Sequence, residues 1–237
     1  VVTLTGAGSS LAVAGETNIG LAGRGIFNIS AGATFNGTAN VFLGEIDDAV
    51  GLITVDGAGS QLTTAANLFV GNEGFGTMNV TTGGFVQAAG AFIGDSDGDS
   101  DANGEGILLV NGSDGSSPST LNITGATFAV GGSSNENGGL GTLNLSGGGL
   151  VNANGIKIGS GNGGAGDGTG TVNVTGAGSL LDADANGTGL FLVGDTGAGT
   201  LNVTAGGRVE AAAARNGNEA GTETANATID GAGSQLA

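Results

Sequence analysis

The sequence predicts an all-β protein: a right-handed parallel β-helix (β-solenoid) of about eight to nine coils, with three short strands per coil. Three observations support this fold class. A short phrase recurs roughly every 25 to 35 residues, each repeat alternates apolar and polar residues, and glycine returns at the same point of seven repeats. Because such a unit buries its apolar face only against its neighbours, residues 1–237 are expected to form a single continuous solenoid.

The first strand of each repeat is a four-residue alternation, clearest at Ile53–Asp56. Ile53 and Val55 are expected to point inward, while Thr54 lies on the outer face. In most repeats the outward middle residue is Asn or Thr, which favours a hydrogen-bonded ladder along that face. The nine copies are Val2–Thr5, Phe27–Ser30, Ile53–Asp56, Met78–Thr81, Leu108–Asn111, Leu143–Ser146, Val172–Thr175, Leu201–Thr204 and Ala227–Asp230.

A glycine-rich turn and a second strand follow. In the third repeat the turn is Gly57–Ser60 and the strand is Gln61–Thr63, centred on Leu62. Several repeats carry Gly-Ala-Gly-Ser here and others carry a Gly-Gly pair, an alternation that suggests a two-coil ancestral unit. The order slips within 95–120, where the loops are longer and the only proline, Pro118, lies.

The third strand of the same repeat, Leu68–Val70, ends at a glycine where the backbone must turn tightly. The eighth repeat departs from this pattern and offers Ala211–Ala214 and then Arg215–Gly217. The seven corner glycines are Gly20, Gly44, Gly71, Gly94, Gly131, Gly159 and Gly194.

Charge and composition exclude several functions. The formal net charge is −17, from 21 acidic and four basic residues, so the surface is expected to repel nucleic acid and anionic lipid. No apolar run reaches 18 residues, so no membrane insertion of this segment is expected.

The chain has neither His nor Cys. Asp182 and Asp184 share a face, but no partner from adjacent coils is expected to join them, so the chain is predicted not to be an enzyme.

An acidic segment, 95–105, carries the strongest signal for a metal. Oxygen-bearing side chains at every second position, with Gly and Ser between them, can surround Ca²⁺, the one cofactor that the sequence suggests. Neither the EF-hand spacing nor the calcium β-roll pattern is met, and a solvated acidic loop is the alternative. The candidate ligands are Asp95, Asp97, Asp99, Asp101, Asn103 and Glu105.

Acidic residues such as Glu45, Glu73 and Asp195 follow the third strand in other coils, which predicts one acidic corner.

The middle residue of the third strand suggests a contact surface. If alternation holds, Phe42, Phe69 and Phe92 stack on the outside of three successive coils, with Leu192 further along. A column of exposed aromatic side chains usually marks a site of contact, whereas neighbouring loops that fold over it would make it structural. We expect this Phe stripe (Phe42, Phe69 and Phe92) to mediate lateral association.

The phrases T-V-x-G-A-G-S and G-T-L-N-V-x-x-G-G resemble repeats of bacterial autotransporter passenger domains and related large surface adhesins. The similarity covers nearly the whole chain. It implies an extracellular location on the surface of a bacterium and a non-enzymatic structural or adhesive role as a cell-surface or matrix rod. A glycan-binding or polysaccharide-acting β-helix domain is the alternative.

Both ends of the chain show the same phase of the repeat, at Val2–Ser9 and at Ala227–Ser234. Neither end carries a polar cap, so the sequence predicts a segment of a longer repeat chain or a subunit that stacks end to end into a filament. The expected partners are therefore copies of the chain itself, associating laterally or end to end, or ligands on host and cell surfaces.

Overall fold

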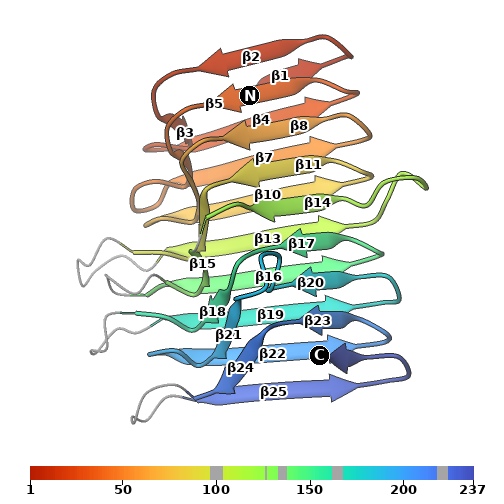
Figure 1. Ribbon diagram of the computed structural model, residues 1–237. Coiled ribbons are helices and arrows are strands. Elements are labelled where there is room, and N and C mark those ends of the chain that lie inside the picture. Colours follow the sequence, from red (N-terminus) through yellow and green to blue (C-terminus); the bar gives the residue numbers. More distant parts are fainter. Residues whose placement is uncertain (97–103, 126, 133–137, 162–167, 218–223) are drawn as a thin grey trace.

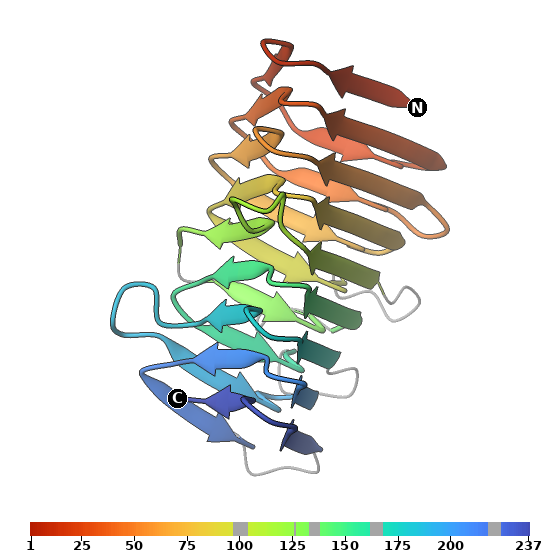
Figure 2. The same ribbon diagram turned by 90° about the vertical axis from the view of Figure 1, so that its right-hand side faces the viewer.

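The computed structural model describes residues 1–96, 104–125, 127–132, 138–161, 168–217 and 224–237. Within these ranges the chain forms three parallel sheets of nine, nine and eight strands, with no helix. Figures 1 and 2 show the coils stacked in chain order, with the N- and C-terminal coils at opposite ends. The predicted β-solenoid with three strands per coil is thus confirmed. In the described part of the chain, no helix has the length and apolarity to cross a membrane.

Each sheet collects one strand from every coil. Sheet A contains β1 (Val2–Thr5), β4 (Arg24–Ser30), β7 (Val50–Asp56), β10 (Phe75–Thr81), β13 (Glu105–Asn111), β16 (Leu140–Ser146), β19 (Thr169–Thr175), β22 (Ala198–Thr204) and β25 (Ala225–Asp230). Sheet B contains β2 (Ser10–Val13), β5 (Thr34–Gly37), β8 (Gln61–Thr64), β11 (Phe85–Ala88), β14 (Thr120–Ile123), β17 (Leu150–Asn152), β20 (Leu180–Asp182), β23 (Arg208–Glu210) and β26 (Gln235–Leu236). Sheet C contains β3 (Thr17–Ile19), β6 (Val41–Leu43), β9 (Asn67–Val70), β12 (Gly90–Ile93), β15 (Phe128–Val130), β18 (Ile156–Ile158), β21 (Leu190–Val193) and β24 (Ala213–Asn216).

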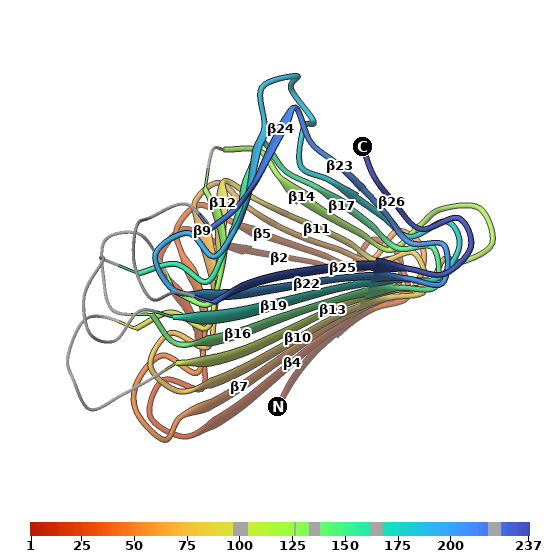
Figure 3. The same ribbon diagram turned by 90° about the horizontal axis from the view of Figure 1, so that it is seen from below.

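The three sheets enclose a narrow apolar core. Seen along the stack in Figure 3, sheets A and B converge at their glycine-rich turns, and sheet C closes the wide side of the wedge. Inward residues at alternate positions, such as Met78 and Val80 of β10, are fully buried, while Thr77 and Asn79, which alternate with them, are only half-buried. The expected alternation therefore places one apolar and one polar face on each strand.

The strands of sheet A are longer than the four-residue phrases predict. Most have seven residues, because they begin three residues earlier and include a glycine at the second position, as at Gly76 of β10. A Cβ atom at Gly76 would lie 2.0 Å from the backbone nitrogen of Gly71, the corner glycine of the same coil. The added residues form the corner between sheets C and A, where two backbone segments approach too closely for a side chain.

The corner glycines of sheet C have the predicted conformation. All seven have positive φ, between 66° and 81°, and the eighth repeat supplies Gly217 with φ 75° after β24. The eighth repeat therefore keeps the corner glycine, and its third strand is Ala213–Asn216, which begins two residues later than the expected Ala211–Ala214.

Serine side chains join coils in pairs at the turns between sheets A and B. The Ser179 hydroxyl donates to the Thr175 carbonyl oxygen at 2.8 Å and accepts a hydrogen bond from the Gly148 amide of the preceding coil at 3.1 Å. The same double contact recurs at Ser60, Ser119 and Ser234. This gives the alternation of turn sequences a physical reason, because each serine-containing turn supplies the acceptor for the glycine amide of the coil before it.

Replacing Ser179 with alanine is expected to lower the free energy of unfolding by about 1 to 3 kcal/mol, because two backbone groups beside a buried hydroxyl lose their partner. Ser9→Ala is the matched control. The Ser9 hydroxyl donates to the Thr5 carbonyl oxygen in the first coil, but it accepts no hydrogen bond from an amide of another described coil. Ser9→Ala should therefore lower the free energy of unfolding by less than about 1 kcal/mol. Chemical denaturation of both variants checks this, and equal losses would contradict the inter-coil role.

Candidate contact surface

The Phe stripe stands on the outer face of sheet C. Phe42 and Phe69 are paired in register across β6 and β9, and Phe69 and Phe92 across β9 and β12. The ring centroids lie 4.7 and 4.9 Å apart, with interplanar angles of 13° and 12°. Because in-register parallel strands repeat at about 4.8 Å, identical outward side chains necessarily stack face to face. The predicted stack is confirmed, with each ring half-buried between its neighbours.

Small or polar residues bound the stripe. Asn18 lies beyond Phe42 in the column, and Ala129 lies beyond Phe92. Ala129 is 1% exposed, so the aromatic column ends in a step where the side chains become short.

Leu192 does not extend this exposed column, contrary to the sequence-based expectation. It lies in the same column of sheet C, but it is only 3% exposed. Its register neighbours are Lys157 and Arg215, both with long side chains. Leu192, Thr188 and Leu190 also line one hollow in the surface. The surrounding side chains therefore bury Leu192.

This hollow, of about 350 Å³, lies beside strands β15, β18 and β21 of sheet C. Its walls combine apolar side chains with the Asn154 amide, two threonine hydroxyls and one cationic side chain, Lys157. The lining residues are Thr127, Phe128, Asn154, Gly155, Ile156, Lys157, Thr188, Leu190 and Leu192.

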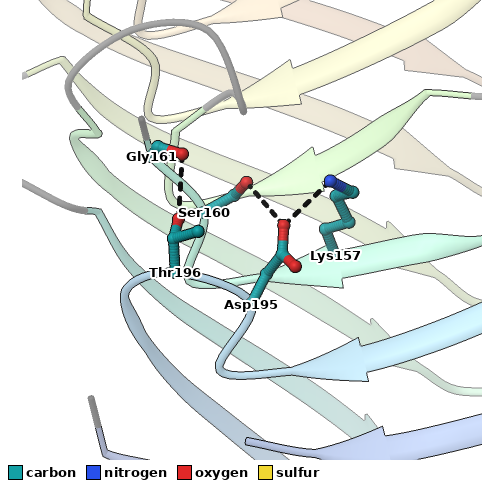
Figure 4. Close-up of polar contacts among 5 residues, drawn as sticks. All are labelled: Lys157, Ser160, Gly161, Asp195 and Thr196. Carbon is teal, nitrogen blue, oxygen red and sulfur yellow. Dashed lines mark hydrogen bonds and ion pairs between the residues drawn. The ribbon is translucent and has the colours of Figure 1, made fainter. Parts of the chain in front are cut away.

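Lys157 belongs to a polar cluster at the end of β18 (Figure 4). Its Nζ lies 2.8 Å from Oδ2 of Asp195, a carboxylate that is almost fully buried. The buried Ser160 hydroxyl donates to the same oxygen at 3.2 Å. Thr196 Oγ1 donates to the Gly161 carbonyl oxygen at 2.9 Å, which links the same two corners again. Asp195 was expected on an acidic surface, and the structure shows instead that it is paired within the fold.

Elsewhere the acidic corner is exposed, as at Asp47 and Asp48. Glu45, at the same corner, has its carboxyl pKa raised, chiefly by partial burial and further by the negative charge of Glu16. The corner is therefore acidic in part, with one carboxylate partly desolvated.

Two of the six predicted calcium ligands, Asp95 and Glu105, lie within the described residues. Asp97, Asp99, Asp101 and Asn103 lie outside the described residues. Asp95 is 4% exposed and forms an antiparallel bridge with Gly138, and Glu105 opens β13. No three Asp, Glu, His or Cys residues within the described ranges gather closely enough to hold a metal ion. Calcium binding stays a prediction.

The outer ladder on sheet A is confirmed over three coils. Asn202 donates through Nδ2 to Oδ1 of Asn173, and Asn173 donates likewise to Asn144, each at 2.9 Å. Leu109 stands next in the column and interrupts the ladder. These amides satisfy one another, so this part of the face is a structural element of the rod.

Asp182 and Asp184 do have neighbours from an adjacent coil, which corrects the sequence-based expectation. Arg208 and Glu210 of β23 line a hollow with them, and these two residues form an ion pair with each other. The Asp184 amide donates a hydrogen bond to Oδ1 of Asp182 at 2.9 Å. The Gly189 amide donates one to Oδ1 of Asp184 at 2.8 Å. Both carboxylates therefore shape the loop after β20.

Comparison with known proteins gives one partial relationship. No known family model matches the chain. No solved structure matches it either. The chain is similar to the adhesin BmaC autotransporter of Brucella suis biovar 1 (strain 1330), with 38% identity over 99 residues. The match covers 40% of this chain and 3% of that adhesin's length.

Proposed function

We propose that this chain is part of an adhesive, non-enzymatic passenger region on the surface of a bacterium, and that the Phe stripe is its adhesive contact surface. The observation that carries the proposal is the stack of three half-buried rings on the outside of a continuous solenoid. Large aromatic side chains, held rigid by stacking, bind at little cost in conformational entropy. The local similarity to an autotransporter adhesin supports the same role.

The rod itself supplies the mechanical part of this function. The coils that carry the stripe are tied to their neighbours by parallel backbone hydrogen bonds in three sheets, so the stripe is presented on a stiff support. The charge of −17 keeps the remaining surface soluble and disfavours anionic partners. The partner is therefore expected to offer apolar groups to the rings and to lack a dense negative charge.

The test is adhesion of beads coated with the purified chain to cultured cells. Phe69→Ser/Phe92→Ser removes two rings from the outer face and leaves the inward positions of β9 and β12 intact, so the fold should persist by circular dichroism. Retention of beads after washing should fall at least about tenfold, since buried aromatic anchors dominate contact energies. Phe75→Ser, which removes an exposed ring from sheet A, is the matched control and should leave retention unchanged.

Clumping of the beads with one another, measured in the same assay, checks the expectation that the stripe joins copies laterally. Retention that the double variant leaves unchanged would contradict the proposal. If soluble glycan then abolished that retention, the glycan-binding alternative would be favoured, with the hollow beside Lys157 as its site.

A further inference from the structure

A second apolar area, on the outer face of sheet A, has no role in the stripe or the core. Four of its side chains are well exposed: Val50 at 38%, Phe75 at 50%, Ile107 at 38% and Leu140 at 51%. Half-buried apolar side chains lie between and beside them on the same outward positions. The sheet A patch comprises Ile26, Val50, Leu52, Phe75, Ile107, Leu109 and Leu140.

The register of sheet A orders this patch into columns. In the outermost column, Arg24, Val50, Phe75 and Glu105 occupy equivalent positions on the successive strands β4, β7, β10 and β13. In the adjoining outward column, the corresponding residues are Ile26, Leu52, Thr77 and Ile107. The patch gives way to the Asn144–Asn173–Asn202 ladder on the following coils. A contiguous apolar area with a polar boundary marks a contact surface.

The two charges of the outermost column cannot pair within one chain. Arg24 and Glu105 are separated by three strand spacings, or about 14 Å. Arg24 is exposed and makes no ion pair with any described residue. A second copy that presents the same column in reverse order would set each of these charges against an opposite charge.

We propose that two copies of this chain pair face to face through sheet A, about a two-fold axis that runs along the strands between β7 and β10. This axis places β4 of one copy over β13 of the other and β7 over β10. Arg24 then faces Glu105 of the second copy, Val50 faces Phe75 and Ile26 faces Ile107. Each of these contacts occurs twice, as an isologous interface requires.

The charges fix the position of the axis. A shift of the axis by half a strand spacing, onto β10, would set Glu105 against Val50 and Arg24 against Leu140. Both carboxylate and guanidinium would then be desolvated without a partner, which is costly. In the outward column beyond Ile26 the contacts are mostly polar, with Thr54 opposite Asn79 and Asn28 opposite Leu109. The apolar and charged contacts therefore define the pairing, while the repulsion of two chains of charge −17 keeps it weak.

Sedimentation of the full chain in 0.15 M NaCl tests this pairing. The expected result is a monomer–dimer equilibrium with a Kd on the order of 10 μM. Arg24→Glu and Glu105→Arg should each weaken the dimer at least about tenfold, because each sets like charges against each other. The double variant R24E/E105R should return the Kd to within about threefold of the original, since the two-fold axis swaps both partners.

Controls match these variants in net charge. Arg215→Glu on sheet C changes the charge as Arg24→Glu does, and Glu16→Arg changes it as Glu105→Arg does; neither should alter the dimer. A chain that stays monomeric up to about 200 μM would overturn the proposal, given the expected affinity. A double variant that fails to recover, or an Arg215→Glu variant that dissociates as readily as Arg24→Glu, would overturn it equally.

Cross-linking gives a second measurement that does not depend on charge. The chain has no cysteine of its own, so Ile26→Cys and Ile107→Cys each introduce a single thiol. Facing sheets lie about 10 Å apart, a distance that a short bis-maleimide spans. A mixture of the two variants should cross-link efficiently, whereas each variant alone should not, because its own thiols lie three strands apart. Equal cross-linking in all three samples would exclude the proposed axis.

The stripe on sheet C takes no part in this pairing. Phe75→Ser should abolish the dimer and leave cell adhesion intact, and Phe69→Ser/Phe92→Ser should do the reverse. Failure of one proposal therefore leaves the other standing.

Discussion

Replacing Gly71 with alanine is expected to lower the free energy of unfolding by about 4 kcal/mol, or to prevent the chain from folding. Gly71 has φ 73°, and a Cβ atom there would lie 2.1 Å from the Glu105 carbonyl oxygen of the next coil. The left-handed conformation costs an alanine about 1 to 2 kcal/mol, and the steric conflict with rigid backbone adds about 1 to 3 kcal/mol. Local separation of the two coils would also break the hydrogen bond from the Asp95 amide to the Gly71 carbonyl oxygen.

Gly112 provides the matched control for this prediction. Its φ is 78°, nearly that of Gly71, but a Cβ atom there would meet no other atom within 4 Å. Gly112→Ala should therefore cost only the conformational part, about 1 to 2 kcal/mol. Denaturant titration of both variants gives the difference directly. Equal losses at Gly71 and Gly112 would show that contact between coils does not set the demand for glycine at the corner.

Replacing Lys157 with methionine is expected to cost about 2 to 3 kcal/mol, the second largest effect. The Asp195 side chain is only 4% exposed, and its carboxylate would remain in the corner without its ammonium partner at 2.8 Å. The Lys157 side chain is 38% exposed, so water offsets part of the loss and the cost stays below that of a fully buried pair. The Ser160 hydroxyl retains its bond to Asp195 in the variant.

A double-mutant cycle separates the pair from its surroundings. Asp195→Asn alone leaves Lys157 free to turn into solvent and should cost less than Lys157→Met. The combination Lys157→Met/Asp195→Asn should be more stable than the sum of the single losses predicts, with a coupling of about 1 to 2 kcal/mol. Additive losses would show that the contact drawn in Figure 4 contributes nothing to stability.

Much of the fold follows from the sequence because a solenoid repeats its local rules. Inward and outward residues alternate with period two, so Met78 and Val80 could be assigned to the core and Phe69 to the outer face before any coil was placed. The corner glycines were predictable for the same reason, since a required positive φ returns once in each coil. The stacking of the Phe stripe then follows from in-register pairing alone.

Other features depended on contacts between coils, which a single repeat does not reveal. Gly76 lies in the part of β10 that precedes the four-residue phrase, and it must be glycine because a Cβ atom there would meet the backbone of Gly71. Ser119 takes the place of the turn serine in the coil with the longest described loop, although the Gly-Ala-Gly-Ser phrase is missing there. The pairing of Lys157 with Asp195 joins residues 38 positions apart at one corner, and no local pattern indicates it.

The sheet A patch escaped prediction for a related reason. All of its members except Leu109 come from the three residues that precede the recognised four-residue phrases, as Val50 and Phe75 do. Only the extended strands, aligned in register, bring them together with Ile107 of β13. Extending each phrase by two period-two steps toward the N-terminus would have been the signal that finds them.

The adhesive role of the Phe stripe is tested most directly by competition. Beads coated with the chain are bound to cells in the presence of excess soluble chain, either unchanged or carrying Phe69→Ser/Phe92→Ser. The account predicts that the unchanged chain displaces the beads and that the double variant, at the same concentration and with the same circular dichroism spectrum, does not. Equal displacement by both would contradict the assignment of adhesion to the stripe.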